Sequence, residues 1–445
     1  MSQSAELLVQ LSPRTVADQM FVAMSFSATV RGPRDARPRR AELAWGSEES
    51  NRFGTDEIIA YCRAIEAEPY ICINMGTGSL DEAQAWVEYC NGTGNTYWAN
   101  QRRENGHAEP YAVRYWGLGN EMYGSWQIGA LEAHEYVAAA RRFAKLMLAT
   151  DPSIELVSCG EWGFTDWDRI VIDGLADLVR YHSIHLYTGS SDYLRNVLQP
   201  HQADRALRVC EALIERARYT QHIRYPIGIA YDEWNVWYRT RSAAGRRQGL
   251  EERYDLSDAL AMACFLNVFV RHCRSVELAN IAQLVNVIAP VFTSADGLFL
   301  QTIYHPLHLY AAHTQSIALE PLVSSPTLAP SEDATAGPDD RDWQVVDLGP
   351  FNALDVVATR DAERRTLVLA VTNRDPVNAI PAALEIVGAT RPVSARVFEI
   401  NGPDVHANNS FEQPDAVNVR ERALEDGAAQ WVFAAHSISL LRLQL

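Results

Sequence analysis

The sequence of 445 residues is poor in lysine and in basic charge. Lys145 is its only lysine, and 39 basic residues stand against 56 acidic ones, which leaves a formal net charge of −17. A nucleic acid or an anionic membrane surface is bound by a basic face. The charge balance therefore excludes both as expected partners and favours a neutral or cationic small molecule.

Paired cysteines are also missing. The seven cysteines are an odd number, contain no Cys-x-x-Cys pair, and mostly lie in apolar runs such as "PYICIN". A disulfide framework or a zinc site would need pairs, so we expect buried thiols in a reducing compartment. No metal is expected, because no metal-ligand spacing links His182, His185, His305 and His313. No cofactor is expected either, since the glycines of "GTGSLDEA" lack the lysine of a phosphate loop.

Long apolar runs are absent as well. The chain does not open with a basic stretch followed by an apolar one, as a secretory signal would. Its most apolar segment, "ELANIAQLVNVIAPVF", contains three amide side chains and is too short to cross a bilayer. These absences predict a cytoplasmic protein.

Strand-like and helical patterns alternate between residues 55 and 316. Such alternation predicts a parallel sheet covered by helices, and continuous apolar strands fit a sheet that is buried on both faces. Six strands are predicted, at 68–76, 111–121, 153–160, 180–189, 226–238 and 281–292. A closed (β/α)8 TIM barrel needs two more, and only about 60 residues precede the first of the six. We therefore expect a barrel that is incomplete at its N-terminus.

The pattern changes after residue 316 to short alternating runs such as "FNALDVVATRD" and "RTLVLAVTNRD", without a long helix. This pattern is typical of an antiparallel β-sandwich. The predicted domains are an atypical N-terminal segment (1–31), a catalytic barrel domain (32–316) and a C-terminal β-sandwich (317–445).

Two of the predicted strands end in a glutamate among aromatic residues. "YAVRYWGLGNE" ends at Glu121, and "PIGIAYDEWNVWY" carries Glu233. Catalytic side chains of a barrel stand at the carboxyl ends of its strands. Hydrolysis of a glycosidic bond needs one carboxylic acid that protonates the leaving oxygen and one carboxylate that attacks the anomeric carbon. Each glutamate alone could cap a helix or pair with arginine, but the two together predict a glycosidase.

Longer motifs make the prediction specific. "YWGLGNEMYGSWQIG" and "YDEWNVWY" resemble the acid/base and nucleophile motifs of the α-L-arabinofuranosidases of glycoside hydrolase family 51. "RPRRAELAWGSEESNRFGTDE", "EPYICINMGTG" and "WVEYCNG" resemble the same family, in the same order, and the resemblance covers residue 32 to the end. It implies a hydrolase of L-arabinose metabolism that removes terminal non-reducing α-L-arabinofuranosyl residues from oligosaccharides by double displacement, with retention of configuration.

The resemblance also implies a role for individual residues. Glu121 would be the general acid/base, with a raised pKa, and Glu233 the nucleophile, with a low one. Asn120 would hold the sugar's 2-hydroxyl, and His185 and Tyr187 would lie beside the nucleophile. The remaining substrate-binding residues would be two apolar walls and an amide in the last barrel strand, namely Trp45, Trp237 and Gln283. Family members tend to form hexamers, so a homo-oligomer is expected.

The front of the chain departs from the family. An Arg-Tyr-Pro-Gly-Gly-Asn motif is expected near residues 15–20, where "TVADQM" stands, and the first two barrel strands are therefore predicted to be lacking. This leaves two alternatives to an active arabinofuranosidase. One is an inactive or weakly active truncated remnant that only binds sugar. The other is a different enzyme of the same clan, such as a xylosidase or an endoglucanase.

Overall fold

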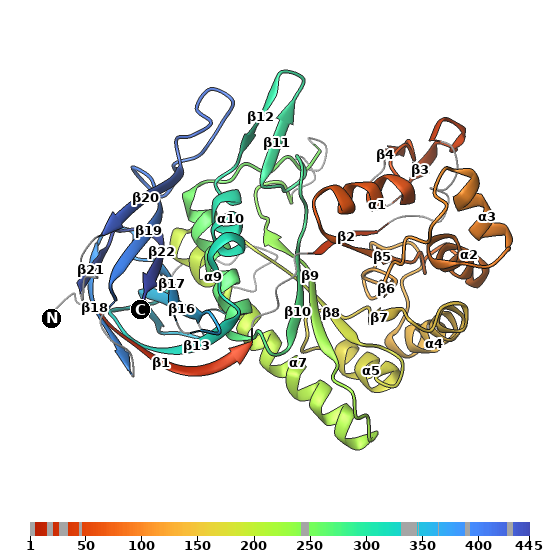
Figure 1. Ribbon diagram of the computed structural model, residues 1–445, viewed down its shortest axis with the longest axis horizontal. Helices are drawn as coiled ribbons and strands as arrows, with labels where there is room; N and C mark the ends of the chain where they lie inside the picture. The colour runs from red at the N-terminus through yellow and green to blue at the C-terminus, as the bar shows by residue number, and fades with distance from the viewer. Residues whose placement is uncertain are drawn as a thin grey trace.

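The computed structural model of the chain describes residues 5–15, 21–25, 34–43, 47–241, 249–330, 345, 347–363, 365–387, 392–424 and 430–445. Two large sheets lie side by side (Figure 1), one surrounded by helices and the other strongly curved. Within these residues, no helix is long and apolar enough to cross a membrane.

The first sheet is made of seven parallel strands. Its order is β2 (Phe21–Ser25), β5 (Glu68–Cys72), β6 (Tyr115–Leu118), β7 (Glu155–Ser158), β8 (Tyr181–Thr188), β9 (Gly228–Val236) and β10 (Val276–Ile281). The two edge strands, β2 and β10, approach each other to within 8 Å between Cα atoms. The sheet therefore curls into a barrel, which, with the second sheet, confirms the predicted fold class.

A layer of side chains fills the interior of this barrel. Six of the seven strands contribute one buried residue each to a single cluster, as the filled core of a TIM barrel requires. The cluster consists of Tyr70, Tyr115, Val157, Tyr181, Ala230 and Leu278.

Helices pack on the outside of the barrel, where the strands' other faces are apolar. Two buried clusters join sheet and helices, one around Trp86 and Trp116 and the other around Trp234 and Phe265. The helices are α1 (Thr55–Ala64), α2 (Leu80–Asn91), α3 (Tyr97–Glu104), α4 (Ala133–Thr150), α5 (Asp166–Leu175), α6 (Tyr193–Leu198), α7 (His201–Thr220), α9 (Leu256–Arg271) and α10 (Tyr304–His313), with a short 3-10 turn η1 (Arg34–Ala36).

Two details of the barrel differ from the sequence predictions. Residues 1–31, in which no barrel strand is predicted, contain β2, which pairs in parallel with β5. The described residues therefore hold one of the two strands expected to be lacking. The strand predicted at 281–292 is wrong: β10 ends at Ile281, and the apolar run beyond it forms a loop and the first strand of a hairpin, β11 (Val291–Ser294) with β12 (Gly297–Leu300).

The second sheet has nine strands and folds over its own core. Its order is β20 (Asn418–Leu424), β19 (Ser394–Asn401), β22 (Ser437–Gln444), β17 (Thr366–Asn373), β16 (Leu354–Arg360), β13 (Ile317–Ser324), β1 (Ala5–Thr15), β18 (Ile380–Val387) and β21 (Gln430–Phe433). Neighbours are antiparallel except β1 and β18, which run parallel. Small two-stranded sheets are β3 (Arg40–Glu42) with β4 (Ser47–Glu49), and β14 (Thr327–Leu328) with β15 (Phe351–Asn352).

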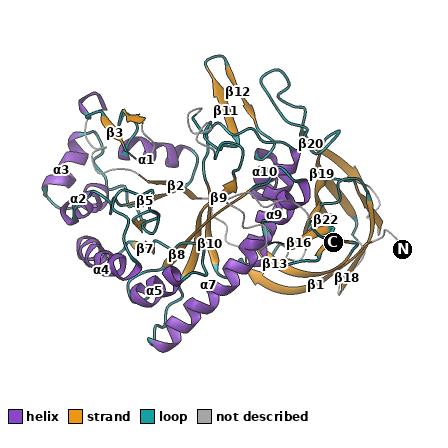
Figure 2. Ribbon diagram, turned by 180° about the vertical axis from the view of Figure 1, so that it is seen from behind, coloured by secondary structure: helices purple, strands orange, loops and turns teal. Residues whose placement is uncertain are grey.

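Helix α9 joins the two bodies, and Figure 2 shows it between them. Leu260 of α9 lies in one buried cluster with Val357 and Val368 of the second sheet. The buried Asp355 of β16 accepts hydrogen bonds from Arg271 and from Asn267 of this helix. Burial opposes the charge of Asp355, but these partners outweigh it and lower the pKa of its carboxyl. The barrel and the second sheet thus share one packed core. The domain boundaries at residues 32 and 317 stay a prediction.

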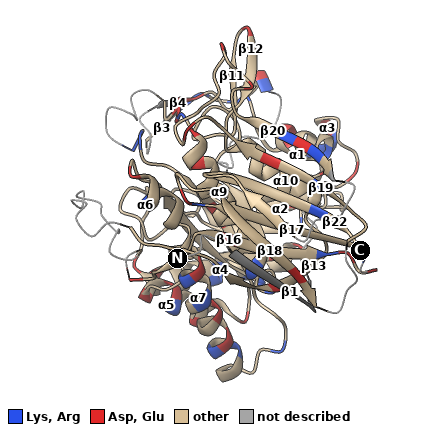
Figure 3. Cartoon of the chain, turned by 90° about the vertical axis from the view of Figure 1, so that its left-hand side faces the viewer, with Lys and Arg blue, Asp and Glu red and all other residues tan. Residues whose placement is uncertain are grey.

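Charged residues of both signs line α5 and α7 (Figure 3), and two carboxylates of α7 contact a histidine at the end of α9. His272, which caps the end of α9, lies with Nε2 3.0 Å from Asp204 and Nδ1 2.8 Å from Glu211, both on α7. Burial disfavours the charged ring, but the two carboxylates outweigh it and raise the pKa of His272 from 6.5 to about 8. The charged histidine therefore fastens α9 to α7.

We expect His272→Asn to remove a pH dependence of stability. Since the folded-state pKa is raised, the contribution is fully present below pH 6.5 and is lost as the pH rises through 8. Up to about 2 kcal/mol of the free energy of unfolding depends on this group. The free energy of unfolding, measured with urea at pH 6 and at pH 9, should fall more between these two pH values in the wild type than in the variant. An equal loss in both would contradict the assignment.

Candidate active site

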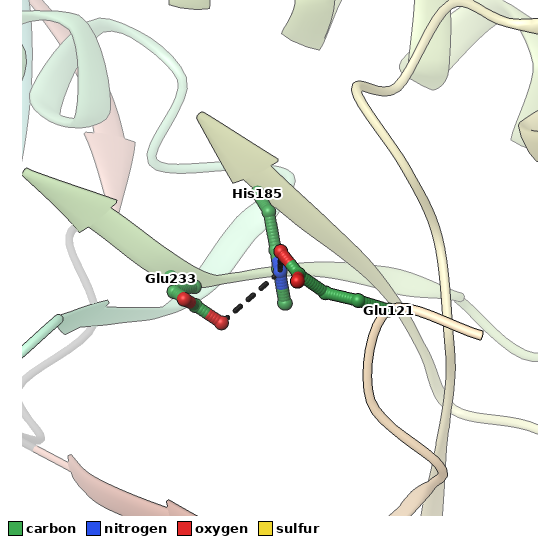
Figure 4. A group of neighbouring side chains, drawn as sticks. All are labelled: Glu121, His185 and Glu233. Carbon is green, nitrogen blue, oxygen red and sulfur yellow. Dashed lines mark hydrogen bonds and ion pairs between the residues drawn. The ribbon is translucent and has the colours of Figure 1, made fainter. Parts of the chain in front are cut away.

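Glu121 stands on a tight turn just past β6. The backbone reaches this turn with positive φ angles at Gly119 (79°) and at Glu121 itself (47°). A residue other than glycine pays about 1–3 kcal/mol for such a conformation, and this strain is found most often at functional sites. The turn directs the Glu121 carboxylate toward β8 and β9, where its partners lie (Figure 4).

Glu233 lies within β9, next to β8. The register of the two strands places His185 beside Glu233 and Tyr187 beside Asn235. The Tyr187 hydroxyl donates a hydrogen bond to Oε1 of Glu233. Residues two apart on a strand face the same way, so His185 and Tyr187 both approach the glutamates, as the sequence predicts.

The imidazole of His185 lies between the two glutamates. Its Nδ1 is 3.0 Å from Oε1 of Glu121 and 3.1 Å from Oε2 of Glu233. One oxygen of each glutamate and the histidine nitrogen all lie within 4.8 Å of one another. The two carboxylates therefore face each other across a single small space.

Asp232 holds the other side of the imidazole. Its Oδ1 is 3.4 Å from Nε2 of His185 and accepts a hydrogen bond of 2.6 Å from Ser183. Its Oδ2 accepts one of 2.9 Å from Tyr70, a residue of the barrel's interior layer. This network fixes the ring that contacts both glutamates.

The pKa values in this site follow from the sharing of charge. Burial alone would lower the pKa of His185, but the carboxylates of Glu233, Asp232 and Glu121 raise it well above its usual value, which favours the charged ring. Burial raises the pKa of Glu233, and the nearby charge of Glu121 raises it further. His185 and Tyr187 lower it, but by less, so that the pKa of Glu233 remains raised. For Glu121, burial is outweighed by hydrogen bonds from His185, Trp126 and Tyr123, and its pKa is lowered.

This order is the reverse of the predicted one, in which Glu121 has the raised pKa and Glu233 the low one. The physical reason is the number of donors, because three groups donate hydrogen bonds to Glu121. Protonation of Glu121 is favoured when one of these contacts is given up.

The three side chains of Figure 4 are spaced closely enough to be considered for a metal ion. A metal would need the lone pair of the histidine nitrogen. Here both carboxylate oxygens lie at hydrogen-bond distance from the same Nδ1, an arrangement that suits an N–H donor and not a free lone pair. The set is therefore a hydrogen-bonded acid–base cluster, and we propose no metal for it.

Three of the other predicted sugar-binding residues follow the ends of β6, β9 and β10 in the chain, and the fourth lies outside the described residues. Asn120 precedes Glu121 on the turn and is half-buried. Trp237 directly follows β9 with its ring 5.1 Å from that of Tyr187, and its indole donates to Thr240. Gln283 is exposed, two residues past β10 instead of within a strand. Trp45 lies outside the described residues.

Three residues of the site are missing from the sequence prediction. Asp232 stands directly before the predicted nucleophile, and two aromatic donors, Tyr123 and Trp126, follow Glu121 at two and five residues. Tyr123 donates to Oε1 of Glu121 at 3.3 Å, and Trp126 donates to Oε2 at 2.7 Å. The only signal was their nearness to the glutamates in the sequence.

Comparison with known proteins agrees with this geometry. Residues 19–205 match the family described as "Alpha-L-arabinofuranosidase 1 domain", and residues 232–437 match "Alpha-L-arabinofuranosidase C-terminal domain". The chain is 41% identical over 430 residues to a probable α-L-arabinofuranosidase C of Aspergillus clavatus, which covers 92% of this chain and 81% of the relative.

Two further relatives agree. The chain is 37% identical over 310 residues to an intracellular exo-α-(1→5)-L-arabinofuranosidase 1 of Bacillus subtilis, covering 66% of this chain and 62% of that protein. The structure of a thermostable GH51 α-L-arabinofuranosidase from Thermotoga petrophila is similar with a TM-score of 0.87 and 32% identity, over 99% of this chain and 100% of the other. The chain therefore belongs to the α-L-arabinofuranosidases of glycoside hydrolase family 51.

Proposed function

We propose that this chain is a retaining α-L-arabinofuranosidase that releases terminal non-reducing arabinofuranosyl residues from arabinose-containing oligosaccharides. The observation that supports this best is the approach of Glu121 and Glu233 to within 4.8 Å. Retaining enzymes hold their carboxyl groups about 5–5.5 Å apart, whereas inverting enzymes leave about 6.5–9.5 Å for a water molecule.

The reaction would take two steps. Glu233 attacks the anomeric carbon while Glu121 gives a proton to the leaving oxygen, and the product is a glycosyl ester on Glu233. Glu121, now ionised, then takes a proton from water, which attacks the same carbon and frees Glu233. His185 balances the negative charge of both glutamates throughout, and Tyr187 holds the attacking carboxylate in place.

The substrate-binding roles of the surrounding residues are part of the same proposal. Asn120, next to the acid/base, would bind the 2-hydroxyl, and Trp237 would form an apolar wall beside Tyr187. Gln283, exposed two residues past β10, would bind a sugar hydroxyl through its amide. Trp45 would also form an apolar wall for the furanose ring.

Cellular location and assembly complete the proposal. All seven cysteines are buried and none forms a disulfide, which supports the cytoplasm, where thiols stay reduced. The Bacillus subtilis relative is named intracellular. We also propose a homo-oligomer, which light scattering of the purified chain would test.

We expect the purified chain to hydrolyse 4-nitrophenyl α-L-arabinofuranoside, and proton NMR should show the α anomer of arabinose as the first product. Matched 4-nitrophenyl xylosides and cello-oligosaccharides should react far more slowly. Preference for either would favour a xylosidase or an endoglucanase. Binding of arabinose without hydrolysis of any glycoside would instead indicate a sugar-binding remnant.

A further inference from the structure

Trp126 is an exposed tryptophan that is held by the acid/base instead of by the core. Its side chain lies in the loop after Glu121 and is 57% exposed. Its indole N–H nevertheless donates a hydrogen bond of 2.7 Å to Oε2 of Glu121. Core packing does not hold so exposed a ring in this one position, so its contact with the carboxylate needs an explanation.

The loop is shaped to hold the indole there. A Cβ atom on Gly124 would lie 2.4 Å from Cε2 and 2.5 Å from Cζ2 of Trp126, which means that the ring lies against the bare backbone of the glycine. The ring also meets that of Tyr123 edge to face, with centroids 5.9 Å apart. Gly124 and Tyr123 together keep the indole N–H directed at Glu121.

The two oxygens of Glu121 have different partners. Oε1 accepts from Tyr123 and faces Nδ1 of His185, whereas Oε2 accepts from Trp126. A carboxylate oxygen accepts a hydrogen bond more strongly than either oxygen of the protonated acid, so this contact stabilises the ionised form of Glu121. The titratable groups that interact with Glu121 among the described residues are Tyr123 on its own loop, His185 and Tyr187 on β8, Glu233 on β9 and Cys159 after β7. Asp232 acts on its neighbour His185, and Glu161 on its neighbour Tyr123.

We propose that Trp126 is a positioning residue that holds Glu121 ionised and gives up Oε2 when the leaving group enters. The inference rests on the proposed function, in which Glu121 must be protonated in the first step and ionised in the second. When the indole moves away, Oε2 takes up one proton from solvent. Once Glu121 has passed this proton to the leaving oxygen, Oε2 accepts from the indole again. The exposure of Trp126 leaves the ring room for this movement.

The test measures the protonation of Glu121 directly in wild type and in Trp126→Phe. The protein is labelled with carbon-13 at the side-chain carboxyls of its glutamates, and a pH titration of the NMR signals gives the pKa of Glu121. The signal of Glu121 is assigned as the one that disappears in Glu121→Gln. Without the indole N–H, the pKa of Glu121 should rise. The alkaline limb of kcat/KM reports the loss of protonated Glu121 and should move to higher pH. The acid limb of kcat reports the formation of ionised Glu121 in the second step and should also move to higher pH. On that acid limb, kcat should fall about tenfold, because a hydrogen bond to a charged group is lost.

Two further variants separate this role from a structural one. Gly124→Ala keeps the indole but displaces it, and should move the Glu121 signal in the same direction as Trp126→Phe. Tyr123→Phe removes a longer hydrogen bond to the other oxygen and should move it less. A titration of Glu121 that is unchanged in both Trp126→Phe and Gly124→Ala would overturn the proposal. Because the titration needs no substrate, it still decides the role of Trp126 if the wild type fails to hydrolyse arabinofuranosides.

Discussion

Glu233→Ala should lower the hydrolysis of 4-nitrophenyl α-L-arabinofuranoside by at least about a thousandfold, because the first step loses its nucleophile. The rest of the cluster would remain in place, since His185 still contacts Glu121 and Asp232. The rate is measured from released nitrophenol. Glu277→Ala is the matched control, because Glu277 lies near the amino end of the neighbouring strand β10, away from the cluster, and this variant should stay close to wild type.

Azide distinguishes the roles of the two glutamates. In Glu233→Ala, azide can take the place of the missing carboxylate and attack the anomeric carbon. A single displacement inverts the configuration of this carbon, so the product should be the β-azide. In Glu121→Ala, Glu233 still forms the ester with a good leaving group, and azide replaces water in the second step, which gives the α-azide. An α-azide from Glu233→Ala, or wild-type turnover without azide, would remove Glu233 from the role of nucleophile.

His185→Asn should lower kcat/KM by about 10²–10³-fold, the loss typical of removing a preorganised charge partner from an active site. The imidazolium balances Glu121, Glu233 and Asp232, and without it three carboxylates repel one another. The pKa of Glu233, already raised by burial and by Glu121, should rise further. Since the nucleophile must be ionised, the acid limb of the pH profile of kcat/KM should move to higher pH.

His182→Asn provides the control for this prediction. His182 is three residues earlier on β8, is equally buried, and lies between Ser158 at 2.9 Å and Asp168 at 3.0 Å. Its replacement should lower the melting temperature without moving the acid limb, because neither glutamate loses a partner. If both histidine variants gave the same pH profile as wild type, His185 would be a structural residue only.

The sequence predicts the two glutamates well because local rules govern them. Apolar strands followed by a turn place Glu121 and Glu233 at the same end of a parallel sheet, whatever the rest of the chain does. The spacing of His185 and Tyr187 on one strand likewise follows from the two-residue period of β structure. The order of the two pKa values could not be predicted in this way, because it depends on donors such as Trp126 that approach Glu121 only in three dimensions.

The predicted strand at 281–292 shows where apolar runs mislead. Burial on both faces was expected to make every barrel strand a continuous apolar run, yet β10 contains Glu277 and Asn280, and the more apolar residues beyond it, Leu284 and Val285, are exposed. The strand of residues 5–15 was missed for a different reason, since its partners β13 and β18 are more than 300 residues away in the chain. Local patterns carry no information about such distant pairing.

The position of β1 between β13 and β18 has a consequence for how the protein is made. A ribosome delivers residues 5–15 long before their hydrogen-bonding neighbours at 317–324 and 380–387. Until those neighbours are made, both edges of β1 stay unpaired. Without β1, the second sheet would have a gap between β13 and β18, and any extended peptide could fill it. Expression of the C-terminal half alone should therefore yield aggregates. Co-expression of the N-terminal segment as a separate peptide should restore soluble protein.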